Sequence, residues 1–233
     1  MIIGNGQIAS RFRDVRLEPN LLIFASGVSN SNCTNRKHFT RERQLVKKAI
    51  DKYPNRKFVY FSSCSLSQNR NLDNDYYAHK REIENIIQDL SQRHVILRIP
   101  QIFSYPKVHS TLIHFLYFSI LRQEEFKLND GATRYLLDVA DIPDVVNDLA
   151  VSHNGIIDVA NPHQYSIRDI VLALESIIKM KAIYSTYSKI DRYDVDFCGL
   201  DMLSARVRKK LSGQSYFYER MSAYHTLFKC AGL

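Results

Sequence analysis

The residue types best suited to chemistry gather in residues 61–84, FSSCSLSQNRNLDNDYYAHKREIE. A cluster of hydroxyl groups and one thiol comes first, and Tyr76 and Lys80 follow at the spacing Tyr-x-x-x-Lys. Residues four apart share one face of a helix, so the pair is either catalytic or two ordinary neighbours. With 14 tyrosines among 233 residues, and as many lysines, about one such spacing is expected by chance. The surrounding elements must decide between the two interpretations.

A second candidate is the glycine-rich segment of residues 4–9, GNGQIA, which fits the pattern G-x-G-x-x-A. It follows a short apolar run and opens a helical pattern, which is the context of a dinucleotide-binding turn. The first glycine permits the tight turn, and the second lets the backbone approach a pyrophosphate. Free N–H groups at the start of the helix would then bind the pyrophosphate. The alternative is a strand-to-helix turn that uses glycine for its conformation alone.

Short apolar runs alternate with amphipathic helical patterns along the first part of the chain. Strands are expected at residues 21–26, 57–63 and 94–100, and helices at 7–16, 41–52 and 75–93. This alternation predicts right-handed crossovers and a parallel sheet. Because the strands are almost continuously apolar, helices are expected on both faces of the sheet.

The pattern changes after Pro100. A helix is expected at TLIHFLYFSILRQ, a strand that turns into a helix at RYLLDVADIPDVVNDLA, and a strand at GIIDVAN. Ser166 and Asp169 predict a capping box at the start of the next helix. From Lys181 onward the chain is rich in tyrosine and shows no regular pattern.

The composition favours an anionic partner. The net charge is +8, from 32 basic and 24 acidic residues. The densest basic stretch, TNRKHFTRERQLVKK, is expected to be the solvated face of a helix.

The four cysteines are widely spaced and no histidine cluster accompanies them, so we expect reduced thiols, no metal site and a cytoplasmic protein. The start has no basic leader, and the longest apolar stretch is about half of a membrane span.

Taken in order, these segments resemble the extended short-chain dehydrogenase/reductase family, which includes nucleotide-sugar epimerases, dehydratases and reductases. GNGQIAS is similar to the dinucleotide turn, and PNLLIFASGVS to the strand that ends beside the nicotinamide. KFVYFSSCS looks like the catalytic strand, YYAHKREIE like the Tyr-x-x-x-Lys helix, and ILRIPQIF like the next strand and substrate loop. The likeness spans about residues 4–178.

The resemblance implies an α/β fold, with a Rossmann-like parallel sheet, helices on both faces and a small C-terminal substrate-binding subdomain. Residues 1–105 should form a reduced NAD(P)-binding core, and 106–233 the rest of the sheet interleaved with the subdomain. Between the glycine turn and residue 21 there is room for one helix only, where the family has two further strands. The sheet should therefore be shortened by about two strands, losing the acidic residue that reads the adenosine ribose.

The resemblance also implies catalytic roles. Tyr76 would be the acid/base, and Lys80 would lower the phenol pKa from about 10 and hold the nicotinamide ribose. A hydroxyl group at the strand end would fix the substrate oxygen, with Ser63 the first choice, Cys64 the alternative register and Ser65 the third. A thiol in that position would be a weak donor. The connection from Ser63 to Tyr76 is shorter than in the family, which should open the site.

NAD or NADP is the implied cofactor. NADP is favoured if Arg11, Arg13 and Arg16 reach a 2′-phosphate, and the alternative is that these three arginines are merely solvated. The residues expected to contact the cofactor are Gly4, Asn5, Gly6, Gln7, Ile8, Ala25, Ser26, Lys80 and Pro100.

A nucleotide-sugar substrate is implied as well. Arg134 matches the arginine that grips the nucleotide diphosphate through its guanidinium fork, and the alternative is a surface residue at the start of a strand. Ser65 and Gln101 are the other residues expected to contact the substrate.

Three functions remain open from the sequence. The first is an NAD(P)-dependent epimerase or 4-keto reductase of nucleotide-activated sugars, acting in polysaccharide biosynthesis and paired as a homodimer. The second is a degenerate family member that binds a nucleotide or a partner protein without catalysis. The third, RNA binding through the basic residues 36–48, is the weakest, because no aromatic stacking platform accompanies the charge.

Overall fold

The chain passes several times between two compact units. The structure is a computed structural model that describes residues 1–69, 74–105 and 111–231. Unit 1 comprises Met1–Ile99, Ala140–Val159 and Asp194–Arg208, and unit 2 comprises Pro100–Val139, Ala160–Tyr193 and Lys209–Leu233. The boundary expected near residue 105 therefore lies close to the first crossing, at Pro100. Two later segments return to unit 1.

Unit 1 is built on a sheet of five parallel strands in the order β1-β2-β3-β4-β9. Its elements are β1 (Ile2–Ile3), α1 (Gln7–Ser10), β2 (Leu21–Phe24), α2 (Arg36–Lys52), β3 (Lys57–Ser63), the 3-10 helix η1 (Cys64–Asn69), α3 (Asp75–Leu90), β4 (His94–Ile99), α5 (Ile142–Ser152), β9 (Gly155–Asp158) and α7 (Cys198–Asp201). Helix α8 (Ala205–Leu211) runs across the boundary between the units. The predicted α/β fold with a parallel sheet is confirmed.

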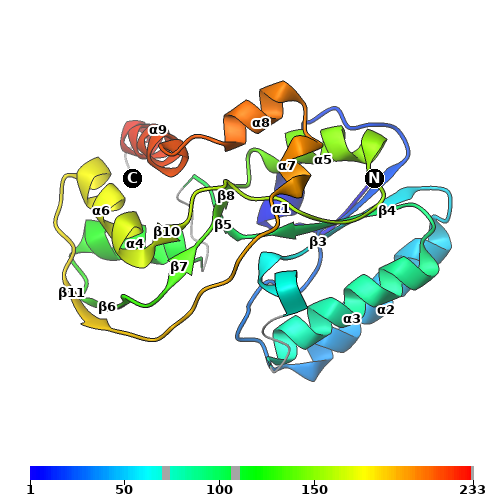
Figure 1. Cartoon of the computed structure of the whole chain (residues 1–233), viewed down its shortest axis with the longest axis horizontal. Helices are drawn as coiled ribbons and strands as arrows, with labels where there is room; N and C mark the ends of the chain where they lie inside the picture. The colour runs from blue at the N-terminus through cyan, green and yellow to red at the C-terminus, as the bar shows by residue number, and fades with distance from the viewer. Residues whose placement is uncertain (70–73, 106–110, 232–233) are drawn as a thin grey trace. The chain divides into compact units, whose positions relative to one another are not determined.

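Alternation along β3 explains why helices cover both faces of the sheet. Phe58 and Tyr60 point to one face and pack with apolar side chains of α2 and α3, which lie side by side (Figure 1). Lys57 points to the other face, where its ammonium donates to the carbonyl oxygen of Ala150 in α5 at 2.7 Å. Six of the seven β3 residues are buried, as expected for a strand in the middle of a covered sheet.

The sheet ends at a very short strand. β1 pairs with β2 through two residues, Ile2 with Ile23 and Ile3 with Phe24. Within the described residues no strand pairs with the free side of β1. The expected loss of one edge of the sheet is therefore present, and the glycine turn lies directly after the edge strand.

A buried carboxylate fastens α3 to the sheet. Glu84, fully buried, accepts a hydrogen bond from the hydroxyl of Ser62 on β3 at 2.6 Å. It also accepts two from the guanidinium of Arg98 on β4, at 2.9 and 2.7 Å. Such a bidentate pair fixes geometry as well as charge. The helix that carries Tyr76 and Lys80 is thus held at its middle by a contact to two strands.

Unit 2 combines helices with three small pairs of strands. Its elements are β5 (Gln101–Phe103), α4 (Leu112–Arg122), β6 (Phe126–Asn129), β7 (Thr133–Arg134), β8 (Leu136–Asp138), β10 (Tyr165–Ser166), α6 (Ile167–Ile178), β11 (Tyr184–Tyr187) and α9 (Tyr216–Cys230). Helix α6 packs against both α4 and α9.

The predicted capping box is confirmed: Asp169 N–H donates to the Ser166 hydroxyl at 3.0 Å, and Ser166 N–H donates to the Asp169 carboxylate at 2.9 Å. In the part of the chain that the structure describes, no helix is long and apolar enough to cross a membrane.

The first two helices differ from the prediction. The helix expected over residues 7–16 is a single turn, α1, because beyond Ala9 only Phe12 is buried against unit 1 and short helices depend on such packing. The helix expected from residue 41 begins earlier, at Arg36. Its start is set by Asn35, whose side chain accepts from Lys37 N–H at 3.0 Å.

The C-terminal region contains more regular structure than its sequence predicted. Residues after Lys181 contain β11 and three helices, of which α9 is the longest. Phe217, Met221 and Phe228 share the buried face of α9. The exposed Tyr218 and Leu227 lie off that face, so the sequence shows no clear apolar stripe. The expected short connection between Ser63 and Tyr76 includes residues 70–73, which lie outside the described residues.

The first prediction concerns the glycine turn. Gly4 has φ +129°, and a Cβ there would lie 2.3 Å from the carbonyl oxygen of Ala25. Gly4→Ala should therefore lower the free energy of unfolding by about 1–3 kcal/mol or more, measured by urea denaturation. Gly6→Ala is the matched control, because nothing lies within 4 Å of a Cβ at Gly6. Equal stability of the two variants would contradict this account of the turn.

Candidate active site

The glycine turn lies against the end of β2. The close approach of Gly4 to Ala25 and Ser26 brings the first glycine together with two residues expected to bind the cofactor. Gly6 is exposed, and its backbone is open to a ligand. Asn5 is exposed and Gln7 and Ile8 are half-buried in the same turn. The arrangement can accept a phosphate, but α1 is one turn long and contributes little helix dipole.

Tyr76 and Lys80 lie in the first two turns of α3. Asn74 caps this helix by accepting from Tyr76 N–H at 2.8 Å, which fixes where the spacing begins. Both side chains are buried, with 7% and 2% of their surface exposed. The Lys80 ammonium lies 5.8 Å from the centre of the Tyr76 ring. The two side chains therefore lie close together, as the motif predicts. Within the described structure, no hydrogen bond joins the Lys80 ammonium to the Tyr76 hydroxyl.

Lys80 is bound instead to two residues that the motif does not contain. Its ammonium donates to the Tyr60 hydroxyl at 2.8 Å and to the Glu42 carboxylate at 3.2 Å. Tyr60 donates to the same carboxylate oxygen at 2.6 Å. His79 contacts the other oxygen at 3.0 Å. We call Glu42, Tyr60, His79 and Lys80 the Glu42 cluster.

The charges of the Glu42 cluster compensate one another inside unit 1. Burial alone would raise the pKa of Glu42, but Lys80, with hydrogen bonds from His79, Tyr60 and a backbone N–H, lowers that pKa to about 2. Burial lowers the pKa of the Lys80 ammonium, against the opposing effect of Glu42. Burial and Glu42 together raise the pKa of Tyr60 well above its ordinary value. Glu42 and Lys80 thus form an ion pair with no net charge. The motif predicts a lysine with an uncompensated positive charge at this position.

The Tyr76 phenol is held in its protonated form. Burial raises its pKa above the ordinary value, and Tyr77 and Glu42 raise it further. A lysine that lowers this pKa is what the family resemblance implies. In this arrangement Lys80 is neutralised by Glu42, so Tyr76 stays a phenol at neutral pH and is a weaker acid than an ordinary tyrosine.

The three candidates at the end of β3 and directly after it, Ser63, Cys64 and Ser65, lie in different environments. The Cys64 thiol is fully buried, donates to the carbonyl oxygen of Arg98 at 3.1 Å, and has a pKa raised well above the ordinary value by burial. This placement does not support a catalytic role for Cys64. Ser63 is half-buried and accepts from Ser65 N–H at 3.3 Å, while Ser65 is itself buried. Ser63 therefore stays the first choice.

The other predicted residues fall into separate places. Pro100, Gln101 and Arg134 belong to unit 2. The Arg134 guanidinium pairs with the Asp191 carboxylate and donates to the Thr133 carbonyl at 2.7 Å. Gln101 is half-buried and donates to the carbonyl of Ile102 at 3.1 Å.

The arginines expected to favour NADP do not lie on one helix. Only the turn up to Ser10 is helical, and Arg11, Arg13 and Arg16 follow it. Arg13 and Arg16 are exposed, whereas the Nε atom of Arg11 is buried without a partner in the described structure. The predicted preference for NADP over NAD gains no geometric support from this segment.

Glu42 is the residue that sequence reasoning missed, although a signal was present. It is the single acid in the basic stretch of residues 34–48. It also falls on the apolar stripe of its helix, with Phe39, Val46 and Ala49. A carboxylate on a buried stripe needs a partner, and Lys80 with Tyr60 supplies it.

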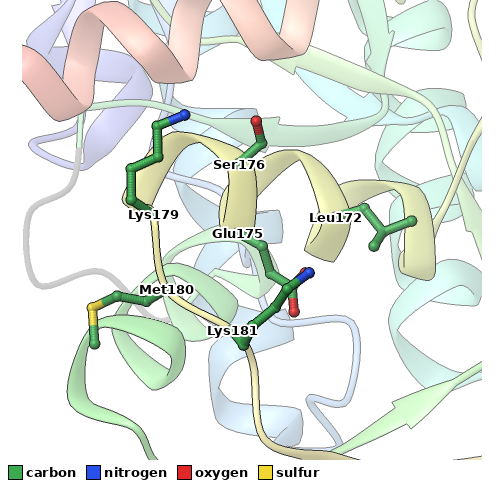
Figure 2. Close-up of a pocket in the computed structure, with 6 residues that line it drawn as sticks. All are labelled: Leu172, Glu175, Ser176, Lys179, Met180 and Lys181. Carbon is green, nitrogen blue, oxygen red and sulfur yellow. The ribbon is translucent and has the colours of Figure 1, made fainter.

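Two surface hollows lie away from this site. One, of about 340 Å³, is formed by the second half of α6 and the turn after it (Figure 2). Its carboxylate, Glu175, is already paired with Lys181 at 2.8 Å. The other, of about 280 Å³, includes Phe58 and Tyr53 at the amino end of the sheet. Neither contains a residue of the glycine turn or the Glu42 cluster.

Several solved structures with a similar fold are described as nucleotide-sugar enzymes. The UDP-glucose 4-epimerase of Thermus thermophilus, solved with NAD, matches with a TM-score of 0.71 at 13% identity, over 91% of this chain and 78% of that one. The UDP-N-acetylglucosamine 4-epimerase of Methanobrevibacter ruminantium, solved with UDP-N-acetylmuramic acid, gives 0.71 at 16%, over 91% and 77%. The dTDP-4-dehydrorhamnose reductase of Bacillus anthracis, solved with NADP, gives 0.71 at 16%, over 90% and 81%.

No protein-family model and no curated protein sequence matches the chain. The likeness to the solved enzymes is therefore one of fold. The chain has the fold of the NAD(P)-dependent epimerases, dehydratases and reductases of nucleotide sugars, as the family resemblance predicted.

The second prediction follows from the Glu42 carboxylate. Its pKa is about 2 in the folded chain against an ordinary 4.5, so its stabilising effect is complete above pH 4.5 and is lost as pH falls toward 2. Urea denaturation across this range should show a loss on the order of 3 kcal/mol from this group. Glu42→Gln should remove that part of the pH dependence. Asp89→Asn, at an exposed position of α3, is the control and should keep it. An unchanged pH dependence in Glu42→Gln would contradict the assignment.

Proposed function

We propose that this protein is an NAD(P)-dependent epimerase or 4-keto reductase of a nucleotide-activated sugar. The observation that carries the proposal is the segment that follows β2. Ala25 and Ser26 contact the glycine turn, and Gly27 contacts the Lys80 ammonium. Three consecutive residues thus connect the place for a pyrophosphate with the buried Tyr76–Lys80 pair, as an enzyme using a nicotinamide dinucleotide requires.

The residues present fit one half of such a cofactor better than the other. The open backbone at Gly6 suits a pyrophosphate, and Lys80, beside Gly27, is the residue that would bind the nicotinamide ribose. Among the described residues no strand lies beyond β1 to enclose the adenosine half, because β1 is the edge of the sheet. When bound, the nicotinamide supplies or takes up the hydride.

The chain's own residues would manage the proton and the substrate. Tyr76, protonated and buried, would donate its proton to the oxygen of a keto sugar, and Ser63 would orient that oxygen. Arg134 would bind the nucleotide diphosphate. Its present partner, Asp191, is an anion that a diphosphate would replace.

A second candidate function is that of a non-catalytic nucleotide- or partner-binding protein. The neutralised Lys80, the single turn of α1 and the unsupportive position of Cys64 favour it. Such a protein would bind a nucleotide or nucleotide sugar with an affinity that does not depend on Tyr76.

The third prediction tests the role of Tyr76. Purified protein would be assayed with a panel of UDP- and dTDP-activated hexoses and 4-keto hexoses, with NAD, NADH, NADP or NADPH. Tyr76→Phe should lower turnover by about 10²–10⁴-fold, because it removes the proton donor, while cofactor binding survives. Tyr77→Phe is the matched control, since Tyr77 is the adjacent, half-buried tyrosine outside the Glu42 cluster.

Turnover retained in Tyr76→Phe would rule out the assigned role. Binding of a nucleotide sugar without turnover, equal in both variants and in the unaltered chain, would instead establish the non-catalytic function.

A further inference from the structure

The Glu42 carboxylate has no unused capacity to accept hydrogen bonds. One oxygen accepts from Tyr60 and Lys80, and the other contacts His79 and accepts from Val28 N–H at 2.6 Å. Two oxygens offer about four lone-pair sites. Glu42 is therefore saturated, and all of its partners are fixed by α3, β3 or the segment after β2.

Lys80 has one unused hydrogen-bond donor. An ammonium has three N–H groups, and in the described structure Glu42 and Tyr60 accept two of them. Gly27 packs closely against the ammonium, because a Cβ there would lie 2.8 Å from the nitrogen and 2.7 Å from the Glu42 carboxylate.

A ribose diol needs more from Lys80 than the Glu42 cluster leaves. Each of two neighbouring hydroxyl groups can accept one hydrogen bond, so an ammonium that binds both needs two free N–H donors. Here one donor remains, and the charge is matched by a carboxylate 3.2 Å away. Binding of the diol would require Lys80 to give up Tyr60 or Glu42, at a cost increased by burial.

We propose that Glu42 and Tyr60 restrain Lys80, so that a nicotinamide ribose competes with the Glu42 cluster for the ammonium and the chain holds its dinucleotide weakly. This inference rests on the proposed function and extends it: Glu42 is a positioning residue that sets cofactor affinity through Lys80. The carboxylate keeps three other hydrogen-bond partners when Lys80 turns away.

Three variants of the full chain test the proposal. Glu42→Gln removes the competing charge with little change of shape, and Tyr60→Phe frees one N–H of Lys80. Glu82→Gln is the control, because Glu82 pairs with Arg43 and does not touch Lys80. Isothermal titration calorimetry with NAD, NADH and NADPH should show binding at least about tenfold tighter for the first two variants and unchanged for the control. A purely structural role would not tighten binding.

A second measurement separates this proposal from the proposed function. Circular dichroism first establishes that each variant is folded. In the unaltered protein, ¹⁵N spectra of the lysine ammonium groups should show a slowly exchanging Lys80 signal, which Glu42→Gln should shift or broaden. If the folded variants bind a dinucleotide no more tightly than the unaltered chain does, the restraint is refuted and the proposed enzyme stands. If neither the variants nor the unaltered chain binds any dinucleotide, although Lys80 is freed, both are refuted.

Discussion

A buried ion pair between Glu42 and Lys80 is the contact on which the carboxyl edge of the sheet depends. Both side chains are almost fully buried, so each charge is tolerable only because the other is present. The pair also joins α2 to α3, and Tyr60 ties both helices to the middle strand. Because breaking such a pair would leave an uncompensated buried charge, α2, α3 and β3 are held in one arrangement, and Tyr76 is positioned by the same contact.

Because the sheet is shortened, the Glu42–Lys80 pair should have a larger effect on the binding of a dinucleotide. A longer sheet would share the binding of a dinucleotide between an adenosine half and a nicotinamide half. With β1 at the edge and α1 reduced to one turn, the free energy of binding must come from the pyrophosphate turn, the ribose and the substrate. The restraint on Lys80 therefore acts on one of the few groups that remain to hold a cofactor, which is why its effect on affinity should be large.

The sequence predicted best where pattern and packing agree. β3 is continuously apolar and lies in the middle of the sheet, so its bounds were found at both ends, and the Ser166–Asp169 box is a local motif that needs no tertiary context. It predicted the location of Tyr76 and Lys80 but not the partner of Lys80, because a spacing of four says nothing about another helix. Helix α9 was missed for the opposite reason: its packing within unit 2 is decided by tertiary contacts rather than by a regular apolar stripe.

Within the proposed function, the electrostatics of the Glu42 cluster act on the proton transfer by Tyr76. Oxidation of a sugar carbinol begins with removal of a proton, which requires a phenolate. Reduction of a keto sugar ends with delivery of a proton, which requires a phenol. Burial and Glu42 both raise the pKa of Tyr76, and the ammonium that would oppose them is already paired. The raised pKa keeps Tyr76 as a phenol between turnovers and disfavours the phenolate, which is the starting form in one direction and the product of proton donation in the other. Proton transfer by Tyr76 would therefore become easier in both directions if Lys80 were released from Glu42.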